Sequence, residues 1–419
     1  MESFQLPEGQ LSSVPTPGGS ARLRLHHGRP LTSAAVRRRL GTISAGVLAV
    51  ALTALAFKTY HLFDFRVFWE AGHRLLTGES LYPSEGALDA NTRNYYVYPP
   101  VVAFVFAPLS LIPYGIAGVL YAVASVAMIF AALRIVGVTD WRCYAVLPFW
   151  MPVLQAVGLG TIAPFLAVAL AVAWRYRDRR LIGAAALGLA IASKLFLWPI
   201  VFWLLATRRY RRALETIGVA AAAIMIPWAV LGFRDFAAYP RVLRLLVRNE
   251  LPTSFSTKAL AGMVGFGPAA LALQLASVVA VFALARRHEG DRRAFSAAIF
   301  AALALSPLVW IHYYVLLIVP IGLAARRLNA VWLLPILAFW VYTDNLSSVW
   351  PVVWVSLVVV GVAVLTLRPT RSEPRGSLRV EEYRPTSTSS RRIGRRSAEP
   401  SLRATTAARP MRPRTAPPT

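Results

Sequence analysis

Lysine, cysteine and acidic side chains are scarce in this sequence. Its 419 residues include one cysteine, 19 Asp and Glu residues taken together, and three lysines, Lys58, Lys194 and Lys258. The single cysteine, Cys143, excludes an internal disulfide and a metal cluster held by several cysteines. The sequence contains no Asp-x-Asp pair and no Gly-rich phosphate-binding loop. We therefore expect neither a metal ion nor a cofactor.

Apolar residues dominate the composition. Hydrophobic residues make up 57% of the chain and aromatic residues 11%, and the mean hydropathy is +0.53. A soluble domain of this length would be far more polar. The composition therefore predicts a membrane protein that crosses the bilayer several times.

Positive charge is unevenly distributed along the chain. The formal net charge is +26, and arginines gather near the two ends and in a few short loops. This pattern argues against nucleic-acid binding and matches the excess of basic residues in cytoplasmic loops. We interpret 1–40 as a disordered cytoplasmic leader, 41–367 as the membrane domain and 368–419 as a disordered cytoplasmic tail. A signal peptide cleaved after Ala54-Leu55-Ala56 is an alternative, which the length of the leader disfavours.

The stretch 64–82 follows the first apolar run, 43–57, and begins with an acidic residue, Asp64. It carries an apolar helical face, which predicts a helix lying in the membrane interface with a carboxylate beside it. On composition alone, the favoured interpretation of Asp64 is an ordinary charge flanking a membrane span. The residues of the predicted face are Phe65, Phe68, Trp69, Leu75 and Leu76.

Three later apolar segments have basic residues at both ends and an interruption in the middle, at 158–160, at Lys194 and at 310–312. If the basic ends are cytoplasmic, each interruption lies on the outer face, together with Asp64. Their limbs are shorter than the ~20 residues that a span usually needs, which a deep external cavity would explain. The three hairpins are 143–158 with 161–174, 181–193 with 195–206, and 295–309 with 313–325.

Two other segments complete the predicted topology. Residues 97–133 are interrupted by four prolines in their first half, which predicts a broken or re-entrant entry before one full span. Residues 232–257 form a second external loop, in which Arg241, Arg244 and Arg248 share one helical face. The total is about eleven spans.

The pattern from Asp64 to Pro100 resembles the amino-terminal signature of glycosyltransferase family 87. The residues that carry the resemblance are Asp64-Phe65-Arg66, Ala71-Gly72, Leu75-x-x-Gly78-x-x-Leu81-Tyr82 and Tyr98-Pro99-Pro100. The resemblance extends from about 43 to 367 and is looser after Pro113. It implies an all-α polytopic fold of the GT-C type, with an interfacial helix in the first external loop, and a polyprenyl-phosphate sugar as donor.

The resemblance also implies roles for individual residues. Asp64 matches the aspartate that acts as the catalytic base. Lys194 and His312 are candidates for binding the donor phosphate or sugar, because Lys194 is a costly charge in an apolar region and His312 lies in a matching Ser-Pro-x-x-Trp-x-His segment. A snorkelling lysine and a packed interfacial histidine are the alternatives. Arg66 is a further candidate for the phosphate, or an interfacial arginine that contacts headgroups.

Trp310 and Tyr313 complete the candidate site as a stacking surface for a sugar, or as residues of the aromatic belt. Two departures from the family pattern concern the hairpin tips. Leu195 stands where relatives often have a proline after the lysine, which removes an expected helix break. The tip 158–161 reads Gly-Leu-Gly-Thr instead of Gly-Gln-x-Asn, which leaves the sugar open.

The predicted function is therefore transfer of a hexose, with mannose favoured, from polyprenyl phosphate to a lipid-linked or cell-envelope glycan. The active site is expected on the outer face of the plasma membrane, in contact with membrane lipids. Transfer of arabinose from polyprenyl-phosphoryl arabinose is one alternative. Others are a lipid or glycan transporter without catalysis, and an inactive relative that serves as an assembly subunit.

Overall fold

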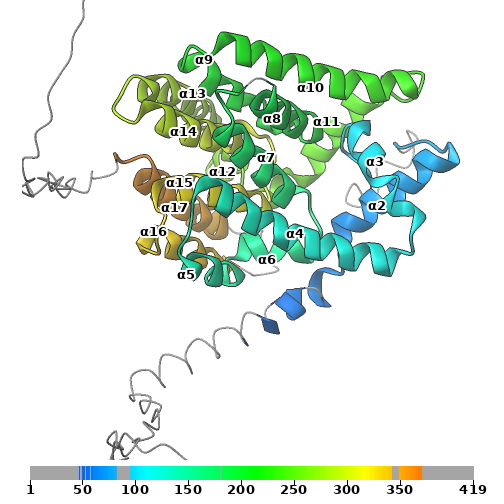
Figure 1. Ribbon diagram of the computed structural model, residues 1–419, viewed down its shortest axis with the longest axis horizontal. Helices are drawn as coiled ribbons and strands as arrows, with labels where there is room; N and C mark the ends of the chain where they lie inside the picture. Colours follow the sequence, from blue (N-terminus) through cyan, green and yellow to red (C-terminus); the bar gives the residue numbers. More distant parts are fainter. Residues whose placement is uncertain are drawn as a thin grey trace, which may run out of the picture. The chain divides into compact units, whose positions relative to one another are not determined.

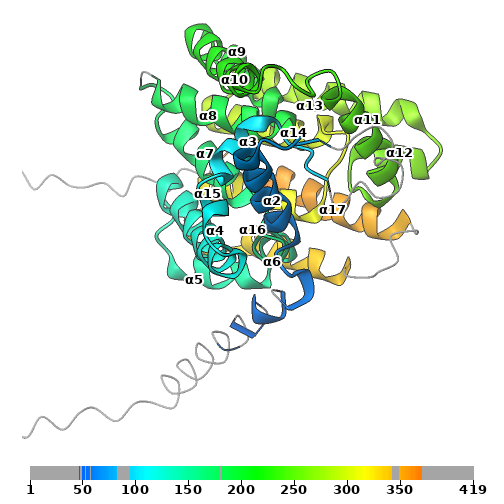
Figure 2. The same ribbon diagram turned by 90° about the vertical axis from the view of Figure 1, so that its right-hand side faces the viewer.

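The computed structural model describes residues 47, 50–51, 53–56, 58–82, 95–179, 181–341 and 349–369. Within these ranges every regular element is helical, and all belong to one compact unit, Met1–Thr370 (Figures 1 and 2). The expected leader, the tail and much of the expected first span at 43–57 lie outside the described residues. The domain boundaries stay predictions.

The first half of the unit contains α2 (Phe63–Thr77), α3 (Pro100–Phe106), η3 (Leu109–Leu111), α4 (Tyr114–Val136), α5 (Trp141–Ala145), η4 (Leu147–Phe149), α6 (Met151–Gly158), α7 (Ala163–Arg175), α8 (Ile182–Ser193), η5 (Leu195–Ile200) and α9 (Val201–Ala206). The second half contains α10 (Tyr210–Val230), α11 (Tyr239–Glu250), η6 (Leu251–Thr253), α12 (Thr257–Met263), α13 (Gly267–Ala285), α14 (Gly290–Leu305), η7 (Ile311–Leu317), α15 (Ile318–Ala324), α16 (Ala330–Leu333), η8 (Leu334–Val341) and α17 (Val349–Thr366).

Four of the described helices, α4, α10, α13 and α17, are long and apolar enough to cross a membrane. The helices α6 and α7 form a further apolar pair, bent by 115° at the break between them. The exposed side chains of α13 include Leu271, Leu275 and Val279, which are costly in water and favourable in lipid. The chain is therefore a helical membrane protein, and the number of eleven spans stays a prediction.

Prolines set the breaks in the segment before α4. Pro100 is the first residue of α3, and Pro108 and Pro113 directly precede η3 and α4. Proline fits the first turn of a helix, where its missing N–H is not needed, but it disrupts a helix interior. The prediction of a broken entry followed by one long helix is thus confirmed.

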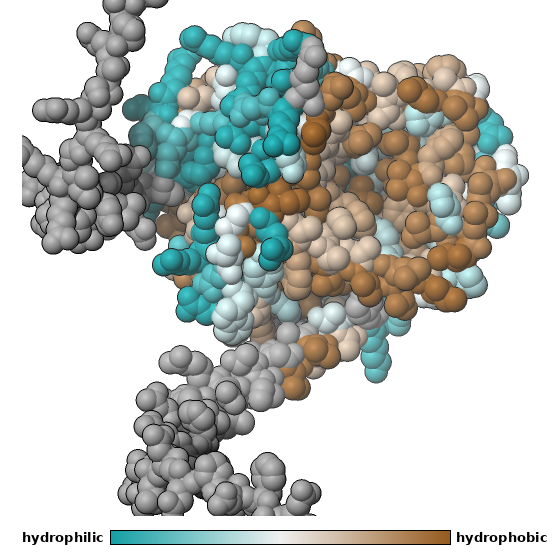
Figure 3. Space-filling view, viewed as in Figure 1, coloured by the Kyte–Doolittle hydropathy of each residue, from teal (hydrophilic) through white to brown (hydrophobic). Residues whose placement is uncertain are grey.

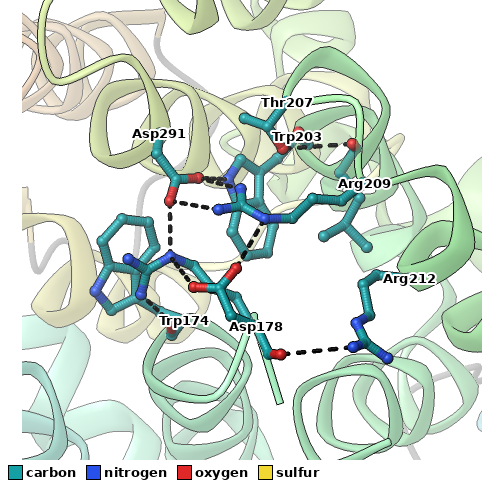
Figure 4. A network of polar contacts seen from close by, with 9 residues as sticks. Trp174, Asp178, Trp203, Thr207, Arg209, Arg212 and Asp291 are labelled. Carbon is teal, nitrogen blue, oxygen red and sulfur yellow. Dashed lines mark hydrogen bonds and ion pairs between the residues drawn. The ribbon is translucent and has the colours of Figure 1, made fainter. Parts of the chain in front are cut away.

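The basic loops gather at one end of the helical unit. Asp291, in the first turn of α14, binds Arg177 after α7 through Nε–Oδ2 at 2.7 Å and Arg209 before α10 through Nη1–Oδ1 at 2.6 Å (Figure 4). Trp203 Nε1 donates a third bond to Asp291 Oδ1 at 2.8 Å. Burial raises the pKa of Asp291, but these hydrogen bonds and the Arg209 charge outweigh it and lower the pKa.

Two arginines of α14 cap the last helix at the same end. Arg292 Nη1 donates to the carbonyl of Thr366 at 2.9 Å, and Arg293 Nε donates to that of Leu367 at 2.7 Å. These carbonyls end α17 and have no partner within the helix. In Figure 3 hydrophilic residues gather toward the left, where α13 and α14 meet in Figure 1, and hydrophobic residues cover much of the right side.

The Asp291 network predicts a stability difference between two neighbouring carboxylates. Asp291→Asn leaves two partly buried guanidinium groups without their shared anion, which we expect to cost about 2 kcal/mol, less than the 3–5 kcal/mol of fully buried pairs. Asp178→Asn is the matched control, because Asp178 contacts the same two arginines but its side chain is 68% exposed. Thermal unfolding in detergent measures both. Equal midpoints for the two variants would contradict this role of Asp291.

Candidate active site

The amino terminus of α2 contacts the tip of the first hairpin, residues 158–160, through backbone hydrogen bonds. The backbone N–H of Asp64 donates to the carbonyl of Leu159 at 2.8 Å, and that of Leu62 donates to the carbonyl of Gly158 at 3.0 Å. The first N–H groups of a helix have no partner within it, so these carbonyls satisfy groups that would otherwise be unpaired. The tip therefore fixes where α2 begins and where Asp64 lies.

Glycines at this tip allow the close approach. Gly160 has φ +68, and a Cβ added there would lie 2.6 Å from Cβ of Phe65. A Cβ on Gly158 would lie 2.8 Å from Cδ2 of Tyr60. No other residue fits either position without displacing α2 or the chain before it. The tip 158–161, which lacks the polar residues of the family pattern, is thus the place where the backbone contacts the start of α2.

An aromatic face holds α2 against α3 and α4. Phe65 and Phe68 are fully buried; Phe65 stacks on Tyr121 with ring centroids 4.9 Å apart, and Phe68 meets Tyr98 edge-on at 4.9 Å. Trp69 and Leu75 pack beside them, as predicted. Leu76, in the last turn, is 51% exposed, so the buried face ends before the helix does.

Lys194 is buried at the second hairpin tip, close to Asp64. Its Nζ donates to the hydroxyl of Tyr98 at 2.9 Å and lies 4.1 Å from the ring centroid of Tyr313. Lys194 is 8% exposed and forms no ion pair shorter than 4.0 Å with the described residues. A buried ammonium with one hydroxyl and an aromatic face around it has the capacity to bind an anion.

Burial and the charge of Lys194 act on Asp64 in opposite directions. Asp64 is half-buried in α2, which is not one of the candidate spans. Burial raises the pKa of Asp64 to about 6, and the positive charge of Lys194 moderates the rise. Burial and then the charge of Asp64 raise the pKa of Tyr98 well above its usual range. The carboxylate and the ammonium therefore belong to one electrostatic site.

His312 also contacts the ring of Tyr313. It is 5% exposed, its ring stacks on Trp310 at 5.9 Å and meets Tyr313 edge-on at 4.8 Å. Its Nε2 is buried and has no hydrogen-bond partner among the described residues. A buried polar atom without a partner is costly, so a ligand oxygen is a fitting partner for it.

The structure corrects one expectation about Lys194. Leu195 in place of proline was expected to remove the helix break, but α8 ends at Ser193 and Lys194 has extended backbone with φ −149 and ψ 98. The segment continues as a 3₁₀ helix that contains Pro199. A proline blocks α-helical bonding to the residue four positions earlier, which is Leu195, so Pro199 accounts for the break.

The predicted residues do not all meet at this site. Asp64, Lys194, His312 and Tyr313 come together, and Trp310 is half-buried beside His312. Arg66, by contrast, has a side chain that is 69% exposed and pairs with Glu70 through Nε–Oε1 at 2.8 Å. It is not among the side chains that surround Lys194.

Tyr98 is the site residue that sequence reasoning did not select. Its signal was present, because Tyr98-Pro99-Pro100 is part of the family signature, but nothing in the sequence connects it to a lysine 96 residues later. Within the described ranges, no three His, Cys, Asp or Glu side chains come close enough to hold a metal ion.

An apolar cavity of about 390 Å³ adjoins the site. Tyr121, which stacks on Phe65 of α2, and Ser193, which precedes Lys194, are part of its wall. The remaining lining residues come from α3, η3, α4 and α7 with the turn before it: Val102, Val105, Phe106, Leu109, Leu120, Ala124, Ile162, Phe165 and Leu166. The cavity is thus suited to a hydrocarbon chain whose polar end reaches Lys194.

Comparison with known protein families finds a match over the central part of the chain. The model of glycosyltransferase family 87 matches residues 96–310, about half of the chain. The chain belongs to glycosyltransferase family 87. The expectation of a membrane-bound sugar transferase of this family is therefore confirmed.

Two curated relatives extend the match. Both are named polyprenol-phosphate-mannose-dependent alpha-(1-2)-phosphatidylinositol pentamannoside mannosyltransferase. The relative from Mycobacterium tuberculosis is 27% identical over 314 residues, which cover 65% of this chain and 72% of the relative. That from Mycolicibacterium smegmatis is 28% identical over 247 residues, covering 53% and 59%. No solved structure matches the chain.

The contact between α2 and the hairpin tip predicts that Gly160→Ala reduces transfer activity at least about tenfold. The added methyl group and the positive φ force α2 away from the tip, and displacements of about 1 Å at a reacting group can cost 100-fold in rate. Gly218→Ala in α10 is the control, because a Cβ there meets nothing within 4 Å. Turnover of the two purified variants is compared. Full activity of Gly160→Ala would show that the contact between α2 and the hairpin tip does not position Asp64.

Proposed function

We propose that this family 87 enzyme transfers mannose from polyprenol-phosphate-mannose to a hydroxyl of a lipid-linked glycan. The observation that carries the proposal is that a half-buried carboxylate, Asp64, and a buried ammonium, Lys194, belong to one electrostatic site beside an apolar cavity. A base and a cation are the two groups that the reaction needs. The names of both relatives support the donor.

Asp64 acts as the general base. It accepts the proton of the acceptor hydroxyl as the oxygen attacks the anomeric carbon of the sugar. A carboxylate with a pKa of about 6 is a stronger base than an exposed aspartate and is still ionised at neutral pH. Its partial burial thus gives it a basicity suited to the task.

Lys194 and His312 stabilise the departing phosphate. As the bond between the anomeric carbon and the phosphate oxygen breaks, negative charge develops on that oxygen, and the ammonium of Lys194 lies ready for it. Tyr98 holds this ammonium in place through its hydroxyl. His312 Nε2 supplies a further hydrogen bond to the phosphate or the sugar, and Trp310 with Tyr313 offers aromatic faces for the sugar ring.

A single displacement with these groups inverts the anomeric centre. The acceptor oxygen forms its bond on the face opposite the departing phosphate, its proton goes to Asp64, and polyprenyl phosphate leaves. A β-linked donor therefore gives an α-linked product. The cavity beside Lys194 holds the first isoprene units of the donor, with the phosphate at the ammonium.

The proposal also includes a position in the cell. The basic ends of several helices gather at one end of the unit, whereas Lys194 follows the last residue of α8, a helix that rises about 18 Å from the end near Arg177. With the basic ends in the cytoplasm, the site opens on the outer face of the plasma membrane. Arg66, on the exposed side of α2, then contacts lipid headgroups.

The first test is transfer by the purified enzyme in lipid with radiolabelled polyprenol-phosphate-mannose and phosphatidylinositol mannosides. Asp64→Asn is expected to lower the rate at least about 100-fold, because a positioned base contributes 10²–10⁴-fold. Glu70→Gln, on the same helix, is the matched control and keeps full activity. Undiminished transfer by Asp64→Asn would exclude the base. Transfer by the wild type only from polyprenyl-phosphoryl arabinose, or from neither donor, would favour the arabinosyltransferase or a non-catalytic role.

The pH profile tests the same assignment. The ionised form of Asp64 is active and its pKa is raised to about 6, so the rate should fall as pH falls through about 6 instead of through about 4. Lys194→Gln removes the charge that lowers this pKa, so the midpoint of the residual activity should move to higher pH. A flat wild-type profile between pH 5 and 7 would contradict the role of Asp64.

A further inference from the structure

The helix α11 presents arginines that the reaction does not use. Tyr239, Val242 and Glu250 of α11 are buried, whereas Arg241, Arg244 and Arg248 are exposed on one face. Arg244 and Arg248 form no ion pair with any described residue, and they lie about 6 Å apart along the helix axis. Arg244 and Arg248 are therefore two exposed positive charges on one face of α11 without an ion-pair partner in the described part of the chain.

The beginning of α11 is attached to the segment that follows α2. Tyr239 packs on Tyr82 with ring centroids 5.2 Å apart. Just before α11, Arg234 donates to the carbonyls of Gly78 and Glu79, both at 3.0 Å. The first turn of α11 is thus fixed relative to the helix that carries Asp64.

The end of α11 is attached to the segment that carries His312. After η6, the backbone N–H of Phe255 donates to the carbonyl of Val309 at 2.7 Å, and that of Val309 donates to Oγ of Ser254 at 2.9 Å. Ser254 is fully buried. The helix therefore connects the two sides of the site, and it lies at the same end of the unit as α2 and α3 (Figures 1 and 2).

The exposed position of these arginines indicates an anion other than the donor phosphate. In the proposed reaction the donor phosphate is bonded to the sugar and lies at buried Lys194. Arginine binds phosphate oxygens with paired N–H groups, and basic faces of interfacial helices attract anionic headgroups. A glycolipid acceptor with a phosphodiester extends from that group in the membrane interface to the hydroxyl that reacts at Asp64.

We propose that Arg244 and Arg248 bind the phosphodiester of an anionic glycolipid acceptor. This inference rests on the proposed function and adds the residues that recognise the phosphodiester of the acceptor. With the phosphodiester on α11 and the terminal sugar at Asp64, the acceptor is held at two points, and the connections of α11 keep these points at a constant separation. The two arginines contribute to acceptor binding and not to the chemical step.

The test uses the full chain in nanodiscs of zwitterionic lipid, so that the donor and the acceptor are the anionic lipids supplied. The variant R244Q/R248Q is compared with R286Q/R287Q, an equally exposed pair at the carboxyl end of α13. We expect the KM for phosphatidylinositol mannosides to rise at least tenfold in R244Q/R248Q, with kcat changed less than twofold. The KM for octyl mannoside, which has no phosphate, and the KM for the donor should not change.

Each other result overturns the proposal in a distinct way. An unchanged KM for the phospholipid acceptor, or an equal rise for octyl mannoside, would exclude phosphate recognition by α11. If added phosphatidylglycerol raised the wild-type KM for the phospholipid acceptor to that of R244Q/R248Q, the face would be assigned to bulk anionic lipid. If the wild type transfers to neither acceptor, the proposed function fails. Native mass spectrometry without donor then tests acceptor binding by itself. If the two arginines bind the phosphodiester, R244Q/R248Q retains phosphatidylinositol mannosides more weakly than the wild type.

Discussion

The contact between the first N–H groups of α2 and the carbonyls of Gly158 and Leu159 determines where Asp64 lies in the site. A hairpin tip has carbonyls that need donors, and a helix start has donors that need acceptors. The hairpin tip and the start of α2 therefore supply each other's missing hydrogen-bond partners. Because backbone atoms make the contact, it places Asp64 without using a polar side chain, and the glycines of the tip are the condition for it.

The apolar surroundings of the site strengthen the electrostatic interactions of its few charged groups. A carboxylate and an ammonium at the surface would be screened by water and would differ little from free groups. Here the aromatic rings of Tyr98 and Tyr313 surround Lys194, and the same surroundings raise the pKa of Asp64. Aromatic residues serve this site well, since they exclude water and still offer a hydroxyl and electron-rich faces to a cation.

The sequence predicted those features that depend on local pattern. The signature around Asp64, the short limbs that meet at Lys194 and the prolines before α4 each indicated an element that the structure contains. Composition predicted a membrane protein. The convergence of Asp64, Lys194 and His312 followed from the distribution of basic loops, because those loops gave the direction in which each tip points.

Features that depend on contacts between distant residues were beyond prediction. Pro199 lies five residues after Lys194, and its effect on the break became visible only in the backbone. The bond from Lys194 to Tyr98 joins the second hairpin to the segment before α3, and neither residue has a local pattern that indicates the other. The shared carboxylate of Asp291 has the same character, because an acidic residue at a helix start usually needs no partner beyond its own helix.

The Asp291 network also has a consequence for the order in which the protein is made. Arg177 and Arg209 precede Asp291 by 114 and 82 residues, so a ribosome completes both arginines well before their shared anion exists. During that interval Asp178 is the acidic residue that contacts both arginines, and the two loops keep an excess of positive charge that favours retention on the cytoplasmic side. Synthesis of α14 then neutralises them and joins three hairpins at once. The same arginines thus act first as topology signals and afterwards, through their ion pairs with Asp291, stabilise the folded helical unit.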